Sequence, residues 1–263
     1  MRAPSLTPSL RVALFCRGFG FVVLAFAQWT LPTHIETLRR SVLAFPFSPI
    51  SLGPLPESQL ELLRSALTGA GASLAAGVLP RTSLAVSAAL VGYFAMLDRS
   101  LYQNHHVFLV ELALLLFCLD RRVLEWPHRR EAPGLPAWQL RALQLLSVSP
   151  YAFGALAKLN PTWLLEAQPV RSWADGLLGD LDDAMGGALG RAVDAALPAG
   201  ADITVPFAYA VCYAGLLLDL LVPIALLRGG TAVRACATAA AACFHLTNRL
   251  LFGLGVFPPL MAP

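Results

Sequence analysis

A single lysine stands out among the basic residues of this chain. Of its nineteen basic side chains, eighteen are arginines and one is Lys158, near the end of the apolar stretch in GALAKLNPTW. Arginine effectively never loses its proton in a protein, whereas burial can turn a lysine into a base. A site that needs an uncharged amine would therefore keep a lysine where arginine serves elsewhere. The alternative is an ordinary lysine whose ammonium group reaches the membrane surface.

Three further ionisable residues lie inside or near apolar stretches, where a charge costs about 2.5 to 3.5 kcal/mol. Asp219 has leucines on both sides in GLLLDLLVP, and Glu111 lies within VFLVELALLLF. We expect each to pair with an arginine or to be protonated, and Asp219 to find its partner on another helix. Arg141 lies near the end of an apolar stretch, so its side chain is expected to reach water or to form an ion pair. All three are interpreted as structural polar residues.

Histidines occur in two apolar segments. His245 and Asn248 are three residues apart and share one helix face, which favours an interhelical hydrogen-bonded pair or a site. His105 and His106 follow a break at QNHH and begin an apolar stretch, which is also typical of an interfacial pair. The sequence has no His-x-x-x-His spacing, and its five cysteines lack metal-site or disulfide spacing. No metal site is predicted.

The composition indicates an integral membrane protein. Hydrophobic residues make up 57% of the chain and charged residues 13%, whereas soluble domains carry about 25% charged residues. Apolar runs of roughly 20 residues recur, which is the length needed to cross a bilayer. Since unpaired backbone cannot face lipid, we predict an all-α, polytopic transmembrane helical bundle within the lipid bilayer. No basic run is long enough to predict nucleic acid binding.

We predict about seven spans in a single transmembrane domain covering residues 1–263. The predicted spans are 12–31, 60–79, 83–101, 107–119, 138–158, 206–227 and 231–257. Apolar residues at helical spacing between the fifth and sixth spans predict an amphipathic helix on the membrane surface near 176–197.

The distribution of arginines predicts the orientation of these spans. With seven spans, the N-terminus, Arg81, the loop DRRVLEWPHRR and Arg228 share one side of the membrane. The positive-inside rule places that side in the cytosol. Lys158, the QNHH break and the acidic loop would then face the lumen or exterior.

Four stretches, in a fixed order, resemble the vitamin K-dependent gamma-carboxylase family. YQNHHVFLVELALLLFCLD resembles the Asn-His segment of that enzyme. YAFGALAKLNPTWL resembles its stretch in which Lys-Leu-Asp is followed two residues on by Trp. GLLLDL and CFHLTNRLLFGLGVFP are similar to its later Leu-Leu-Leu-Asp and Phe-His-x-x-Asn segments. The resemblance covers nearly the whole chain, at the level of the membrane portion called the HTTM domain.

The resemblance implies a gamma-glutamyl carboxylase, a lyase with vitamin K epoxidase activity. In that family a lysine deprotonates vitamin K hydroquinone, and reaction with O2 then generates a base strong enough to remove a glutamate γ-proton, so that CO2 can add. Lys158 matches the lysine base and His105 the histidine implicated in carboxylation. Asn104 matches the Asn-His segment, and His245 and Asn248 match the later pocket motif. The implied cofactor is vitamin K hydroquinone or a related quinol, without a metal, and the implied partner is a glutamate-containing protein or peptide.

The chain departs from the family pattern at three points. The family's paired lysines are Ala157 and Lys158 here, and its Lys-Leu-Asp ends in Asn160. His106 and Glu111 have no counterpart in the family pattern. We also expect the family's large C-terminal lumenal domain to be absent, because the sequence stops after the membrane portion. Two alternatives stay open: a non-catalytic membrane protein that binds a quinone, a lipid or a protein partner, and a small transporter. Charges at mid-membrane favour the transporter, and the lack of an inverted repeat counts against it.

Overall fold

The computed structural model describes residues 8–40, 52–97, 104–119, 124, 136–196, 198 and 202–252. Every regular element within these ranges is a helix, as predicted. The chain divides into two compact units, one formed by the described residues up to Leu146 and the other by Ser147–Phe252. The boundary falls within helix α7 (Ala137–Lys158).

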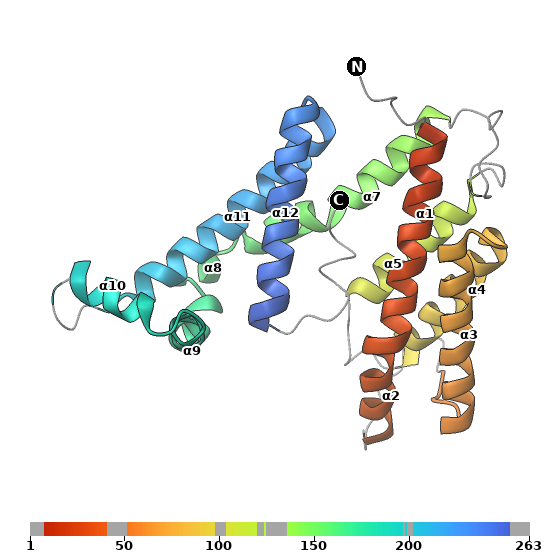
Figure 1. Cartoon of the computed structure of the whole chain (residues 1–263), viewed down its shortest axis with the longest axis horizontal. Coiled ribbons are helices and arrows are strands. Elements are labelled where there is room, and N and C mark those ends of the chain that lie inside the picture. The colour runs from red at the N-terminus through yellow and green to blue at the C-terminus, as the bar shows by residue number, and fades with distance from the viewer. Residues whose placement is uncertain are drawn as a thin grey trace. The chain divides into compact units, whose positions relative to one another are not determined.

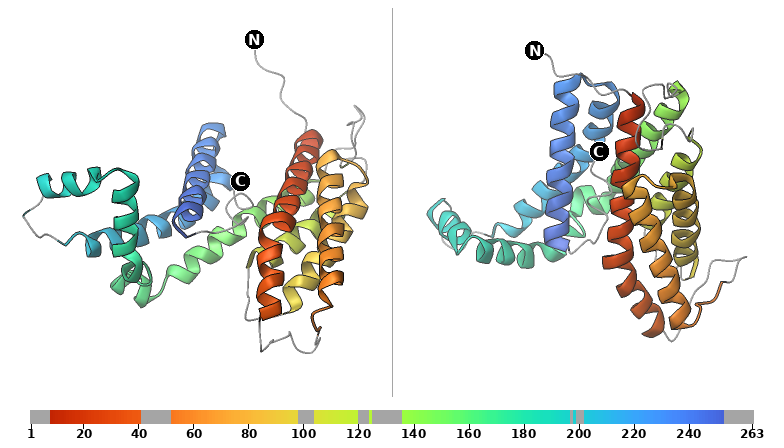
Figure 2. Two further views of the ribbon diagram at one scale, coloured as in Figure 1. Left: turned by 60° about the horizontal axis from the view of Figure 1, so that its bottom comes forward. Right: turned by 45° about the vertical axis from the view of Figure 1, so that its right-hand side comes forward.

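The first unit is a set of helices packed in sequence order. Helix α1 (Pro8–Ala25) continues through a π-helical turn, Phe26–Thr30, into α2 (Leu31–Arg40). Helices α3 (Glu57–Ala76), α4 (Pro80–Leu97) and α5 (Asn104–Phe117) follow. Helix α3 packs against both α1 and α4, and α4 packs against α5 (Figure 1). The same neighbours run side by side in both views of Figure 2.

Glycines bring the backbones of α1 and α3 close together. A Cβ atom added at Gly71 would lie 2.8 Å from the backbone nitrogen of Leu24, and one added at Gly20 would collide with the backbone of Ala75. Small residues that permit such close approach are typical of helix contacts in membranes. The pairing of α1 with α3 therefore depends on these two positions.

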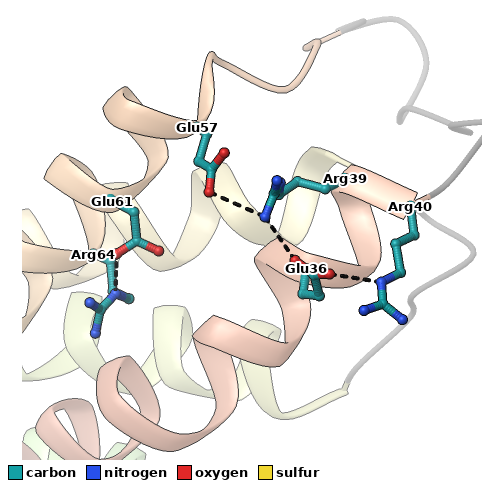
Figure 3. Close-up of polar contacts among 6 residues, drawn as sticks. All are labelled: Glu36, Arg39, Arg40, Glu57, Glu61 and Arg64. Carbon is teal, nitrogen blue, oxygen red and sulfur yellow. Dashed lines mark hydrogen bonds and ion pairs between the residues drawn. The ribbon is translucent and has the colours of Figure 1, made fainter.

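Ion pairs join α2 to α3 at one end of the first unit (Figure 3). Arg39 lies 3.0 Å from Glu36 and 3.2 Å from Glu57, so it bridges the two helices. Arg40 also pairs with Glu36, at 2.7 Å. Because these side chains are exposed, the pairs contribute little stability individually. They place a charged surface at the end of the apolar helices.

The second unit contains the end of α7 and five further helices. These are α8 (Pro161–Glu166), α9 (Val170–Ala184), α10 (Ala188–Ala196), α11 (Thr204–Arg228) and α12 (Thr231–Phe252). Helix α11 is central and packs against α8, α9 and α12 (Figure 1). Its Ala208 and Cys212 are fully buried against Ala167 and Ala174.

Polar contacts fix the start of α11. The Thr204 hydroxyl donates to Asp175 of α9 at 2.6 Å. The Thr204 backbone N–H donates to Asp202 at 2.8 Å, and this bond lowers the pKa of the Asp202 carboxyl from its usual value. The first turn of α11 is thereby held to the acidic segment before it.

Among the described residues, three helices are long and apolar enough to cross a membrane: Leu10–Arg40, Pro80–Leu97 and Thr204–Arg228. A shorter apolar helix covers His106–Phe117. The predicted spans 60–79, 138–158 and 231–257 overlap α3, α7 and α12, whose described residues are not among these three candidates. The prediction of about seven spans is therefore not confirmed. The first span was also predicted too short, because the helix continues past residue 31 through α2, whose exposed face is charged.

The amphipathic segment near 176–197 is helical on both sides of a break. Helix α9 ends at Ala184 and α10 begins at Ala188. Between them Gly186 and Gly187 have φ angles of +61° and +75°, which side chains other than glycine rarely adopt. The backbone N–H of Gly190 donates to Asp182, so the second helix folds back toward the first. One continuous helix was expected, and the glycine pair makes it two.

The close contact of α1 with α3 predicts an asymmetric effect of alanine at two neighbouring glycines. Gly71→Ala should lower the free energy of unfolding by about 1 to 3 kcal/mol, because its Cβ collides with backbone that cannot move alone. Gly69→Ala adds a methyl group where nothing lies within 4 Å, so it should be neutral or stabilising. Unfolding of both variants in detergent, followed by circular dichroism, measures the difference. Equal loss in both variants would contradict the close packing.

Candidate functional site

Lys158 forms an ion pair with Asp219. The last residue of α7 places its Nζ 2.6 Å from Oδ2 of Asp219 on α11, and 3.5 Å from the backbone oxygen of Gly154. The two side chains are 18% and 6% exposed. A buried charge is tolerated only when it is paired, so each residue accounts for the presence of the other. Asp219 has a partner on another helix, as expected, and that partner is the lysine and not an arginine.

Two glycines leave room for the pair. A Cβ atom at Gly154 would lie 2.6 Å from Oδ2 of Asp219 and 3.6 Å from Nζ of Lys158. On α11, a Cβ atom at Gly215 would lie 3.7 Å from Cε of Lys158. The carboxylate therefore lies directly against the α7 backbone at Gly154.

The chain turns immediately after Lys158. Asn160 accepts a hydrogen bond from the backbone N–H of Trp163 at 2.9 Å and donates to the carbonyl of Ala157 at 2.7 Å. It thus caps the start of α8 and satisfies a carbonyl at the end of α7. An aspartate at this position could cap α8 equally well, but its carboxylate could not donate to the Ala157 carbonyl.

Trp163 lies beside the lysine. The Lys158 Nζ is 5.2 Å from the centre of the indole ring, within the range of a cation–π contact. The indole N–H donates to the carbonyl of Cys212 at 3.1 Å, which fixes the ring against α11. The tyrosines of α11 hold α8 from the other side, since Tyr209 and Tyr213 donate to the carbonyls of Leu165 and Leu164.

A second pair of polar residues also involves helix α7. The Tyr151 hydroxyl and Nε2 of His245 are 2.8 Å apart and both side chains are buried. Tyr151 belongs to α7 and His245 to α12, so this bond is the interhelical contact that the sequence suggested for His245. The second unit thus brings a lysine, a carboxylate, a phenol and an imidazole together from three helices. Such a set can accept, hold and donate protons in surroundings that contain little water.

The structure describes some of the predicted site residues and not others. Lys158, Asp219 and His245 all lie in the second unit. Asn104 and His105 lie in the first turn of α5, and Asn248 lies in α12. The side chains of these last three residues are outside the described part of the structure. Their predicted roles stay predictions.

Glu111 and Arg141 are the other two residues interpreted as structural polar residues. Both side chains are exposed on their helices, α5 and α7. Their stretches are apolar overall, but each residue lies on the face that points away from the packed neighbours. Within the described ranges, no group of three or more His, Cys, Asp and Glu residues could hold a metal ion.

Sequence reasoning missed Tyr151 and a second histidine cluster. Tyr151 lies in an apolar stretch, where a tyrosine is an ordinary core residue. Its contact with His245 becomes visible only in the folded structure. In the first unit, His34 and His106 are buried with ring centres 5.2 Å apart, and Phe26 contacts His106 edge-on at 4.9 Å. His34 lies beyond the predicted end of the first span and follows the π-helical turn, an element frequent at functional sites.

The helical fold and the Lys158–Asp219 pair define an α-helical membrane protein that holds a lysine–aspartate pair between its helices. Residues 8–262 match the model of the HTTM domain, and the chain therefore belongs to the HTTM domain family, the membrane portion of vitamin K-dependent carboxylase-family proteins. This confirms the resemblance found in the sequence. No curated protein matches the chain, and no solved structure does.

The contact at Gly154 predicts that alanine there separates α7 from α11. Its methyl group would overlap the Asp219 carboxylate, so Gly154→Ala should lower the free energy of unfolding by about 1 to 3 kcal/mol. Gly179→Ala is the matched control, because nothing lies within 4 Å of its added Cβ. Thermal unfolding in detergent compares the two. If Gly154→Ala were as stable as the control, the carboxylate would not lie against the α7 backbone.

Proposed function

We propose that this chain is a membrane enzyme similar to the vitamin K-dependent gamma-carboxylase, with the Lys158–Asp219 pair as its base. One observation carries the proposal: the only lysine of the chain is held by a buried carboxylate at 2.6 Å. Membership of the HTTM family supports it, because Lys158 matches the lysine base in the family pattern.

The pair accepts a proton as a unit. Two ionisable groups this close titrate together, so the added proton belongs to the pair and not to one defined atom. An ammonium beside a carboxylate and an amine beside a carboxylic acid are both neutral overall, and the second form offers an uncharged amine that can take up a proton. This modifies the hypothesis drawn from the sequence, in which Lys158 was an uncharged amine acting alone.

The residues around the pair fit a hydroquinone on chemical grounds. A weakly acidic phenolic hydroxyl requires a base shielded from water, which a paired, mostly buried amine provides. Trp163 adds an aromatic face beside the amine. The absence of side chains at Gly154 and Gly215 keeps the lysine uncrowded on the α7 and α11 sides.

The remaining roles follow the family pattern. When bound, vitamin K hydroquinone or a related quinol, oxidised by O2 to an epoxide, supplies the driving force for replacing a glutamate γ-proton with CO2. Lys158 and Asp219 take the hydroxyl proton, and His245, Asn248 and Asn104 hold the quinol. His105 serves the carboxylation half. The apolar helices exclude water, which would otherwise return a proton to the glutamate carbon.

The proposed surroundings are a lipid bilayer, which delivers the quinol, and a glutamate-containing protein or peptide as acceptor. We propose that the N-terminus is cytosolic and that the site faces the lumen or exterior, on the distribution of arginines. The apolar helices support membrane insertion.

Replacing Lys158 with arginine tests the proposal. Arginine keeps the positive charge and can still pair with Asp219, but it does not release its proton. Lys158→Arg should therefore lower quinol epoxidation by about 10²- to 10⁴-fold, the usual contribution of a general base. The measurement is epoxide formed from vitamin K hydroquinone in membranes that contain the full chain. Arg171→Lys, an exposed exchange on α9, is the control and should leave the rate unchanged.

The outcomes separate the alternatives. Equal epoxidation by wild type and Lys158→Arg would remove Lys158 from the mechanism. Absence of epoxidation in wild type, together with saturable binding of the quinone, would instead favour the non-catalytic binding protein.

A further inference from the structure

One face of α7 carries both proton-binding pairs. Tyr151, Gly154 and Lys158 are spaced by three and four residues, so they line the same side of the helix. The carboxylate of Asp219 lies against Gly154, where an added Cβ atom would be 2.6 Å from Oδ2. Gly154 is about one helical turn from Tyr151 and one turn from Lys158 along α7, so the carboxylate lies on the face that carries both residues.

Tyr151 links this carboxylate to His245. Its hydroxyl occupies Nε2 of the imidazole at 2.8 Å, and a bond at one ring nitrogen fixes both the orientation of the ring and its tautomer. Because Asp219 lies against Gly154, three residues from Tyr151 on the same face of α7, its negative charge acts on the phenol. Because like charges repel, an anionic Asp219 favours a neutral tyrosine that donates to His245 over a phenolate.

We propose that Tyr151 is a positioning residue that couples the two pairs, holding His245 in one tautomer and responding to the charge on Lys158 and Asp219. When the Lys158–Asp219 pair gains a proton, its net charge rises by one. The proton in the Tyr151–His245 bond then shifts from the phenol oxygen toward Nε2, and no other bond changes. The use of this coupling in turnover rests on the proposed function. The coupling itself is a property of the folded chain.

Nuclear magnetic resonance of the full chain labelled with ¹⁵N-histidine tests the coupling without any turnover. The His245 signals are assigned by their loss in His245→Gln. Tyr151→Phe, which removes only the hydroxyl, should move the Nε2 resonance, and Asp219→Asn should move it as well. In the Tyr151→Phe background, adding Asp219→Asn should have no further effect. Tyr93→Phe removes a hydrogen-bonded hydroxyl from the first unit and is the control that should leave His245 unchanged.

Two results would overturn the coupling. One is an Nε2 resonance that Tyr151→Phe leaves in place. The other is an Asp219→Asn shift of equal size with and without the tyrosine hydroxyl. If Tyr151→Phe does not fold, Asp219→Asn alone decides, since an unmoved His245 signal in that variant excludes any effect of the carboxylate.

Enzyme kinetics test whether the coupling through Tyr151 contributes to quinol epoxidation. In quinol epoxidation, Tyr151→Phe should lower kcat by about 10- to 100-fold while KM for the quinol changes little, because the variant misplaces a group and removes no binding contact. An unchanged kcat would overturn the role of Tyr151 in turnover. If the wild-type chain has no epoxidase activity, the proposed function fails while the resonance experiment still decides the coupling.

Discussion

The pairing of Lys158 with Asp219 is the interaction on which the second unit depends. Either charge alone, placed among apolar helices, would cost several kcal/mol. Together they are tolerated only if α7 and α11 approach closely enough for a 2.6 Å contact. Gly154 and Gly215 permit that approach from the two sides. The ion pair, the close approach of α7 to α11 and the two glycines therefore depend on one another.

The residues at the end of α7 also contribute to the site. Lys158 is its last residue, at the helix end where exposed carbonyls favour a positive charge. Asn160 then uses both halves of its amide, one on the end of α7 and one on the start of α8. Helix α8 in turn carries Trp163 back over the lysine. The short helix is therefore part of the site, although its length suggests a simple connection.

Much of this could be predicted from the sequence, and the rest required the fold. Apolar runs predicted helices in all seven places, and leucines around Asp219 predicted a partner from another helix. That the partner is Lys158, 61 residues away, depends on how the helices pack, which spacing along one chain does not reveal. Tyr151 was missed for the same reason. The number of spans is not confirmed, because some of the predicted stretches carry charged residues in their first turns, as α3 does with Glu57 and Glu61.

Acylation of the lysine amine tests the central pairing most directly. Because the chain has one lysine, a small membrane-permeable acylating reagent gives a single ε-amine signal by mass spectrometry. The amine can attack the reagent only after it leaves the carboxylate, because its Nζ lies 2.6 Å from Oδ2 of Asp219 and the Lys158 side chain is only 18% exposed. We predict that Lys158 in the wild-type chain reacts more slowly than Lys158 in a folded Asp219→Asn variant at the same pH. Equal rates would contradict the account, because they would show that the carboxylate does not hold the amine.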